Sequence, residues 1–362
     1  MKIKNIFFAA ILVLAGFSCS MEDDAIMNDV EKGIEEATEA YTVLDFGVAF
    51  NEMATKASTT VVPGEDRPAT GDENNDEKKI SEVSVFLLED GKVIGILIPQ
   101  NRNQVSSNSD GSITLKDLKF VTKYKTNRTL EAHVVINGNQ FLKNINIGDA
   151  QSALNQQISG CLSADQLIKY GSTRIVFGKD ITNSYSSPSV AENNPTTILV
   201  KVSHVAARLD FSQFDVTLKG FEGNPTVVFD EAKFVNLQQN GKIVEGDASV
   251  NVKDGAFLNR SNRIGTKWTD MGTAYGYANQ YKQDSEMNTA LYVKCTVDGR
   301  TFEKTYPINP AGITKEVDHN GIKGGYLYDI KVRWTITPDW GDSTIEFYTR
   351  DWVHNSIPEI VL

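Results

Sequence analysis

The 362-residue chain has little of several features that commonly reveal a function. Its three cysteines are too few for a disulfide scaffold. No apolar run reaches the roughly 18 residues that a membrane-spanning helix needs. Basic tracts are also missing, and the formal charge is −11. We therefore expect no nucleic-acid partner, because such affinity comes mostly from Lys and Arg on phosphates.

Catalytic and cofactor motifs are missing as well. The chain has no nucleophile elbow, zinc-protease motif, Walker loop or dinucleotide-binding glycine pattern. Its four histidines lie apart from one another and from the cysteines. The glycine-rich stretch 321–325 precedes a predicted strand, whereas a phosphate loop precedes a helix. We therefore expect no enzyme, no cofactor and no metal site.

The N-terminus has the pattern of an export signal. Lys2 and Lys4 precede an apolar stretch over 6–17, which is typical of a secretory signal peptide. Cys19 follows, where an acidic stretch begins, as in bacterial lipoproteins whose cysteine is lipidated. We predict a lipoprotein signal peptide over 1–18, with an ordinary signal peptide as the alternative. In the exported body, Cys161 and Cys295 either form a disulfide or are buried as small apolar residues.

Most of the chain alternates apolar and polar residues with a period of two, which predicts half-buried strands. In the first, over 42–50, one face carries Leu44, Phe46, Val48 and Phe50. A hairpin is predicted over 83–98, with its turn at Asp90 and Gly91. Further strands are predicted at 112–118, 128–136, 175–177, 197–211, 217–218, 226–237, 289–297, 300–308, 326–337 and 343–354. Short helices are predicted at 30–40, 149–158 and 163–170, and turns at 240–241, 254–255 and 298–299.

Strands this short and this often interrupted are typical of β-sandwiches and not of α/β folds. One set of strands passes to the next near 205–215 without a linker rich in Pro or Ser. We therefore predict a mostly β fold of two tightly packed β-sandwich domains, over 57–207 and 208–362, with a few short helices. Residues 63–79 contain no large apolar side chain, and we predict a mobile loop there.

Short motifs follow one another in a fixed order along the chain. They are Cys19, 54–57, the hairpin segment 80–98, 205–210, 275–279 with 289–293, 306–308, 326–332 and 351–353. In this order they resemble the FimA-type fimbrillins, or type V pilins, of Bacteroidetes. Ala278 departs from the family pattern, which has Glu at that position. The resemblance implies transthyretin-like sandwiches and a place in a fimbrium at the outer membrane and cell surface.

The resemblance also implies a mechanism of assembly. The chain would be a structural fimbrial (pilus) subunit that supports cell adhesion and biofilm formation. It would be exported with palmitate on Cys19, which attaches the precursor to outer-membrane lipid. An Arg- or Lys-specific protease would cut between Lys56 and Ala57. Donor-strand exchange with copies of itself or with related fimbrial subunits would then build a head-to-tail polymer.

Residues 19–56 would be a propeptide that carries the removable first strand. They hold ten acidic and two basic side chains, whereas 57–362 has a formal charge of only −5, so the charge changes near Lys56. Arg67 and the pair Lys78 and Lys79 are alternative cut sites. The donor strand would lie in 343–362, with these apolar residues available: Ile345, Phe347, Val353, Ile357, Ile360 and Leu362.

Three other interpretations remain open at this point. The strand over 42–50 could be the permanent first strand of the fold. The chain could be an anchor or terminal subunit that keeps its lipid and residues 19–56. It could also be a monomeric surface lipoprotein that binds glycans by stacking them on Trp340 or Trp352.

Overall fold

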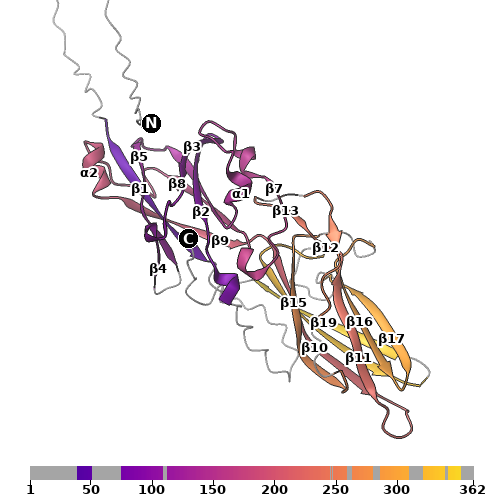
Figure 1. Cartoon of the computed structure of the whole chain (residues 1–362). Helices are drawn as coiled ribbons and strands as arrows, with labels where there is room; N and C mark the ends of the chain where they lie inside the picture. The colour runs from indigo at the N-terminus through magenta and orange to yellow at the C-terminus, as the bar shows by residue number, and fades with distance from the viewer. Residues whose placement is uncertain are drawn as a thin grey trace, which may run out of the picture. The chain divides into compact units, whose positions relative to one another are not determined.

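Strands dominate the part of the chain that the structure, a computed structural model, describes (Figure 1). This part comprises residues 39–50, 75–108, 112–244, 246, 248–258, 263–279, 286–309, 321–338 and 341–351, the last as backbone alone. All of them belong to one compact unit that begins at Glu39. Among these residues the α-helices are short, α1 (Asn139–Leu142) and α2 (Pro188–Glu192). The predicted mostly β fold is confirmed.

The first sheet has eight strands in the order β3-β2-β6-β8-β9-β1-β5-β4. They are β1 (Tyr41–Phe50), β2 (Val83–Glu89), β3 (Lys92–Leu97), β4 (Val105–Ser107), β5 (Ile113–Lys123), β6 (Thr129–Ile136), β8 (Lys169–Val176) and β9 (Thr196–His204). Strands β8 and β9 pair at two positions only, Lys169 with His204 and Tyr170 with Ser203. The sheet therefore folds into two halves, and apolar residues from both halves form one core cluster.

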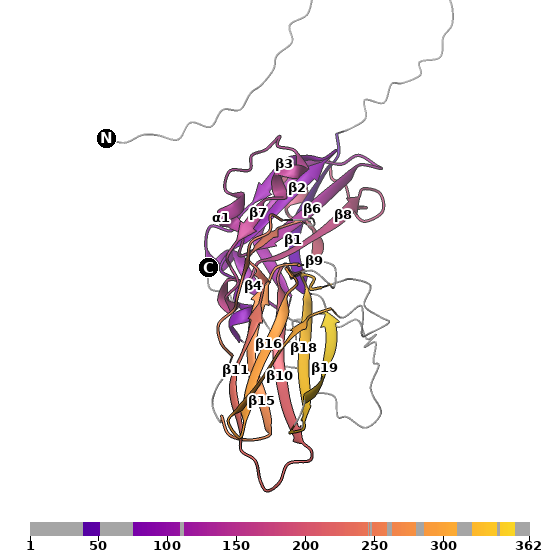
Figure 2. The same ribbon diagram turned by 90° about the vertical axis from the view of Figure 1, so that its right-hand side faces the viewer.

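The second core lies between a four-stranded sheet, β15-β10-β18-β19, and a three-stranded sheet, β11-β16-β17 (Figure 2). These strands are β10 (Ala207–Leu218), β11 (Val227–Val235), β15 (Lys267–Gly276), β16 (Ala290–Val297), β17 (Arg300–Pro307), β18 (Tyr326–Ile336) and β19 (Gly341–Asp351). Phe214 stacks on Trp268 at 5.3 Å between ring centroids and meets Trp334 edge-on at 5.1 Å.

A third apolar cluster contains residues from both halves of the chain, among them Val135, Ile158, Ile243 and Tyr277. Two small sheets lie near it, β7 (Gln157–Ser159) with β13 (Asn240–Lys242), and β12 (Leu237–Gln238) with β14 (Val252–Lys253). The β7–β13 pair thus joins strands from the two halves directly. The domain boundaries given above stay a prediction.

Several predicted elements need correction. The predicted helix over 149–158 is a single 3-10 turn, Gln151–Leu154, followed by β7. The helix over 163–170 is the 3-10 turn Ala164–Gln166, after which β8 begins. The strand over 197–211 is two strands, β9 and β10, separated at 205–206, and the predicted turn at 240–241 lies in β13.

The predicted mobile loop is also partly wrong, because Asn75–Lys78 form a 3-10 helix, η1. Residues 63–74 and most of the predicted helix 30–40 lie outside the described residues. Cys161 and Cys295 are both free thiols, so the predicted disulfide alternative is wrong. Cys295 is fully buried and Cys161 half-buried. Trp268 and Trp334 are core residues, whereas the side chains of Trp340 and Trp352 lie outside the described part.

Candidate strand-exchange site

Strand β1 lies in the interior of the first sheet, between β5 and β9. It pairs antiparallel with β5, from Tyr41 opposite Lys123 to Val48 opposite Ile113. It pairs parallel with β9, from Leu44 to Phe50. Both of its edges are therefore hydrogen-bonded. If β1 left, β5 and β9 would face each other with unpaired N–H and C=O groups, and such edges invite another strand.

The four residues that the alternation predicts to share one face do so. Leu44, Phe46 and Val48 are fully buried, Phe50 is 6% exposed, and all four belong to the first core cluster. Burial of each such side chain is worth about 2 kcal/mol. The core face of β1 is therefore apolar from Leu44 to Phe50, and emptying its place would be costly unless another strand replaced β1.

The sequence pattern missed that β1 is covered on its other face too. Val43 alternates with Leu44, so a half-buried strand would leave it exposed, but it is fully buried. Helix α2 packs against β1 and β5, and Ala191 on this helix is also fully buried. The adjacent apolar residues Val43 and Leu44 could have indicated burial on both faces, because half-buried strands have polar residues on the outer face.

The first residues of β1 are held by contacts at its beginning. Tyr41 exchanges two backbone hydrogen bonds of 2.8 Å with Tyr185, and Tyr124 N donates to Ala40 O at 2.7 Å. Tyr41 Oη donates to the Glu39 carboxylate at 2.6 Å, and Lys123 Nζ forms an ion pair with the same carboxylate. The hydrogen bond from Lys123 lowers the pKa of Glu39. An exposed ion pair between Glu39 and Lys123 thus links the segment before β1 to β5.

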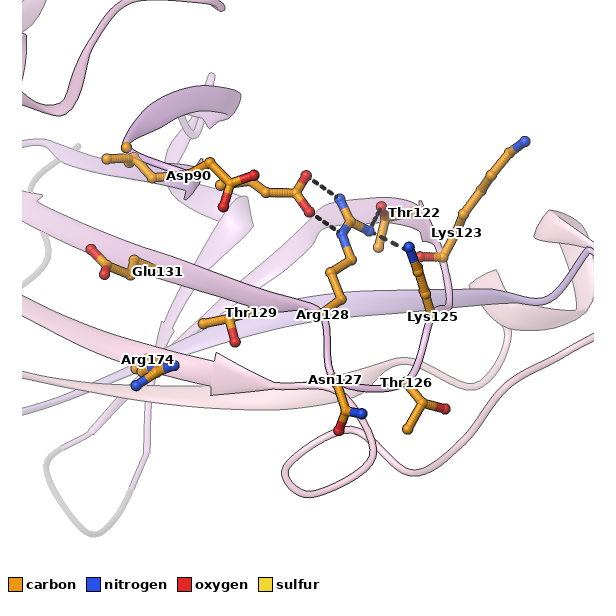
Figure 3. Close-up of a pocket in the computed structure, with 13 residues that line it drawn as sticks. Asp90, Thr122, Lys123, Lys125, Thr126, Asn127, Arg128, Thr129, Glu131 and Arg174 are labelled. Atoms are coloured by element: carbon orange, nitrogen blue, oxygen red, sulfur yellow. Dashed lines mark hydrogen bonds and ion pairs between the residues drawn. The ribbon is translucent and has the colours of Figure 1, made fainter.

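A polar pocket of about 1000 Å³ lies beside this end of the strand, and Lys123 is one of its lining residues (Figure 3). Arg128 lines it as well and donates to both Glu89 oxygens, to Thr122 Oγ1 and to Lys123 O. In Figure 3 the Arg174 and Glu131 side chains lie away from this pair. No group of three metal-ligating side chains occurs among the described residues. The pocket therefore lies where Arg128 links β2, β5 and the start of β6 through its ion pair with Glu89 and its hydrogen bonds to β5.

Strand β19, in the predicted donor segment, lies at the edge of its sheet. In the described part of the chain it pairs with β18 alone, from Gly341 opposite Ile336 to Asp351 opposite Tyr326. Its backbone places Ile345 opposite Val332 and Phe347 opposite Ile330. A strand held by a single ladder can detach more easily than β1, which is held by two. The structure keeps β1 and β19 in different sheets.

Other predicted site residues lie outside the described part of the chain: Cys19, Lys56, Ala57, Arg67, Val353, Ile357, Ile360 and Leu362. Lys78 and Lys79 do lie within it, at η1. In the described residues no helix is both long and apolar enough to cross a membrane.

Solved structures resemble this chain over most of its length, although no protein-family model and no curated protein sequence matches it. A candidate cell adhesion protein from Parabacteroides distasonis is 17% identical, with a TM-score of 0.58 over 86% of this chain and 98% of its own. A second one from that organism is 13% identical, with a TM-score of 0.50 over 87% and 99%. A fimbrilin from Porphyromonas gingivalis is 14% identical, with a TM-score of 0.49 over 86% and 98%. The first two likenesses show that the chain has the same β fold as these candidate cell adhesion proteins.

Proposed function

We propose that the chain is a structural subunit of a surface fimbrium and polymerises by donor-strand exchange. The observation that carries this proposal is the position of β1. It is the first described strand, it lies between β5 and β9, and it fills an apolar groove with Leu44, Phe46 and Val48. The residues that follow it, 51–74, contain two of the candidate cut sites, Lys56 and Arg67.

In this proposal β1 is a placeholder that a protease releases. The precursor is held at the outer membrane through lipidated Cys19, and cleavage after Lys56 leaves β1 attached to the fold by noncovalent contacts only. A strand from residues 343–362 of a second subunit then takes its place. Main-chain hydrogen bonds to β5 and β9 supply generic affinity, and the positions of Leu44, Phe46 and Val48 supply pockets for alternate side chains.

The geometry of such an exchange sets the form of the assembly. The groove lies in the first sheet and β19 in another sheet, so each subunit has one acceptor and one donor on different surfaces. A contact between unlike surfaces repeats from subunit to subunit, and it gives an open filament where the rotation between subunits does not close a ring. The neighbours' descriptions as cell adhesion proteins support a role in adhesion at the cell surface.

The test is controlled proteolysis of a Cys19→Ser chain without residues 1–18, followed by N-terminal sequencing and electron microscopy. We expect a new N-terminus at Ala57 and filaments after trypsin treatment. A Lys56→Gln chain should give no N-terminus at Ala57 under the same conditions. A chain without residues 357–362 should be cut normally and stay monomeric. Filaments from that truncated chain, or native filaments whose subunits begin at Cys19, would overturn the proposal.

A further inference from the structure

The carboxylate of Glu77 is fully buried, although it lies in a run of charged residues on the 3-10 helix η1. Arg208 Nη1 donates to Glu77 Oε2 at 2.8 Å, and Tyr275 Oη donates to the other carboxylate oxygen. Arg208 lies on β10 and Tyr275 on β15, in the sheet that follows the first one. Glu77 therefore fastens the segment before β2 to strands that lie more than a hundred residues further along the chain.

Two buried cations, Arg208 and Lys169, donate hydrogen bonds to Glu77. Lys169 is fully buried, and its Nζ donates to the Glu77 carbonyl oxygen at 3.0 Å. Arg208 Nε also donates to Asp210 Oδ1 at 3.0 Å. Burial opposes the charge of Arg208, but the Asp210 and Glu77 carboxylates outweigh burial and raise its pKa. Burial and the Glu77 charge raise the pKa of Tyr275, so the phenol stays a donor.

The residues that follow Glu77, 79–81, are also bound to the fold by hydrogen bonds and burial. The Asn137 side chain donates from Nδ2 to Lys79 O at 2.9 Å and accepts from Ser81 N at 2.9 Å. Ile80 is fully buried in the first core cluster. Proteases cut segments that can leave the fold locally, which exposed loop tips do most readily. The peptide bonds after Lys78 and Lys79 thus lie between two fully buried residues, Glu77 and Ile80, which keep this segment from leaving the fold locally.

We propose that Glu77 sets the downstream limit of proteolytic processing, so that the mature chain keeps η1 and the cut lies before Asn75. This inference rests on the proposed function for the processing step itself. Hydrolysis after Lys78 or Lys79, in which water adds to the peptide bond to leave a carboxylate and an amine, would release Glu77 with the propeptide. Arg208 would then keep a buried charge without its Glu77 partner, and removal of one member of a buried pair is strongly destabilising.

The test is a time course of limited digestion with a Lys-specific protease, with new N-termini identified by sequencing. The substrate is the Cys19→Ser chain without residues 1–18. We expect that the wild-type fold yields no N-terminus at Lys79 or Ile80 while cleavage before Asn75 goes to completion. Glu77→Gln should raise the rate of cleavage after Lys78 and Lys79 at least tenfold.

Asp76→Asn is the matched control, because it removes one carboxylate from the same 3-10 helix. Asp76 is half-exposed and pairs with Lys79 at 2.7 Å on the surface, so we expect less than a threefold change in rate. Tyr275→Phe removes one hydrogen bond to Glu77 and keeps the half-buried ring. It should raise the rate of cleavage after Lys78 and Lys79 severalfold. If Glu77→Gln fails to fold, the rate of this variant tests the role of Glu77.

The outcomes separate this inference from the proposed function. Rapid wild-type cleavage after Lys78 or Lys79 would overturn the role of Glu77, whether or not filaments form. Equal rates in wild type, Glu77→Gln and Tyr275→Phe would also overturn it. A cut before Asn75 without any filaments would contradict donor-strand exchange but would support the limit set by Glu77.

Discussion

The guanidinium of Arg128 and the carboxylate of Glu89 form a two-point ion pair, with Nε–Oε1 at 2.6 Å and Nη2–Oε2 at 2.8 Å (Figure 3). The pair joins the end of β2 to the residue that precedes β6. Arg128 Nη1 also donates to Thr122 Oγ1 and Lys123 O on β5. One side chain therefore joins β2 and the start of β6 to β5, the strand that pairs with β1.

Replacement of Arg128 by Ala should destabilise the fold. Two-point charge-assisted hydrogen bonds are stronger than single ones, and this pair is only partly exposed, so we expect a loss of about 1–2 kcal/mol. The measurement is the free energy of unfolding from urea titration at pH 7. Lys125→Ala, in the same pocket, is the control and should stay within about 0.5 kcal/mol of wild type. Equal losses in the two variants would contradict the role of the pair.

The same pair predicts a pH dependence. The hydrogen bond from Arg128 lowers the pKa of Glu89 below its ordinary value of 4.5, although partial burial opposes this. A carboxylate whose pKa is lower in the folded state stabilises the fold above its unfolded pKa and loses this effect as the pH falls. Glu89→Gln should therefore be less stable than wild type at pH 7, and the difference should shrink below pH 4.5. Urea titrations at several pH values measure it, and a difference that stays constant down to pH 2 would contradict the assignment.

The sequence predicts the elements whose local pattern agrees with the final fold. In β1 the period-two alternation marks the core face correctly, because β1 pairs with β9 without a break and its register shift against β5 adds no residue to β1 itself. The turn between β16 and β17 is marked by Asp298 and Gly299, which both have positive φ, 46° and 81°. The turn between β2 and β3 follows the same rule at Asp90 and Gly91. Short-range chemistry suffices in these cases.

Strand β15 was missed because its alternation is broken. Asp270 and Gly272 have positive φ, and the register against β10 shifts between Phe211 and Gln213. A bulge adds one residue to a strand and moves the following side chains to the other face. The polar and apolar residues of β15 therefore fit no single period, although Trp268 and Met271 are buried.

Glu77 was missed for a different reason. The run of charges around it predicts a loop, since such segments cannot bury a core by themselves. Its partners Arg208 and Tyr275 are 131 and 198 residues away in sequence. No local pattern connects residues this far apart, so only the folded chain brings the three together. The buried apolar face of β1, in contrast, follows from the residues of β1 itself.

The aromatic centre of the second core should dominate its stability. Phe214 contacts both Trp268 and Trp334, and Trp334 Nε1 donates to Tyr306 Oη. Phe214→Ala should cost about 3–5 kcal/mol, because it removes a buried ring and leaves a cavity. Trp334→Phe should cost less, since one six-membered aromatic ring is kept and only the remaining part of the indole and its hydrogen bond are lost. Thermal and urea unfolding measure both.

The control for these variants is Leu199→Ala, an apolar truncation on a strand surface. Leu199 is 52% exposed, so its loss should change the free energy of unfolding by less than about 1 kcal/mol. A Phe214→Ala variant as stable as Leu199→Ala would show that these rings do not form the centre of the core.

The two free thiols of the body should react at very different rates. Burial and the nearby Asp230 carboxylate raise the pKa of Cys295 to about 12. The thiolate is the reactive form, so only about one Cys295 in ten thousand is ionised at pH 8. Cys161 is half-buried, and burial raises its pKa. In a Cys19→Ser chain, iodoacetamide should label Cys161 first and Cys295 only after denaturation, as peptide mass mapping can show. Early labelling of Cys295 would contradict its burial.

A peptide with the sequence of residues 39–50 should act as a chain terminator for assembly. It carries the whole of β1 together with Glu39, so it can pair with β5 and β9, fill the core positions of Leu44, Phe46 and Val48, and restore the contact with Lys123. A subunit whose groove is filled by the peptide has no place for a donor strand. Added to the 57–362 chain in excess, the peptide should raise the melting temperature of the subunit and shorten the filaments seen by electron microscopy.

The matched control is the same peptide with Phe46→Asp and Val48→Asp. It keeps the backbone groups that pair with β5 and β9 but places two carboxylates in the first core, where unpaired charge is costly. It should neither stabilise the subunit nor shorten filaments at the same concentration. If both peptides shorten filaments equally, the effect is not insertion into the groove. If neither raises the melting temperature of the 57–362 chain, the place of β1 is not an exchangeable acceptor, and β1 is the permanent first strand of the fold.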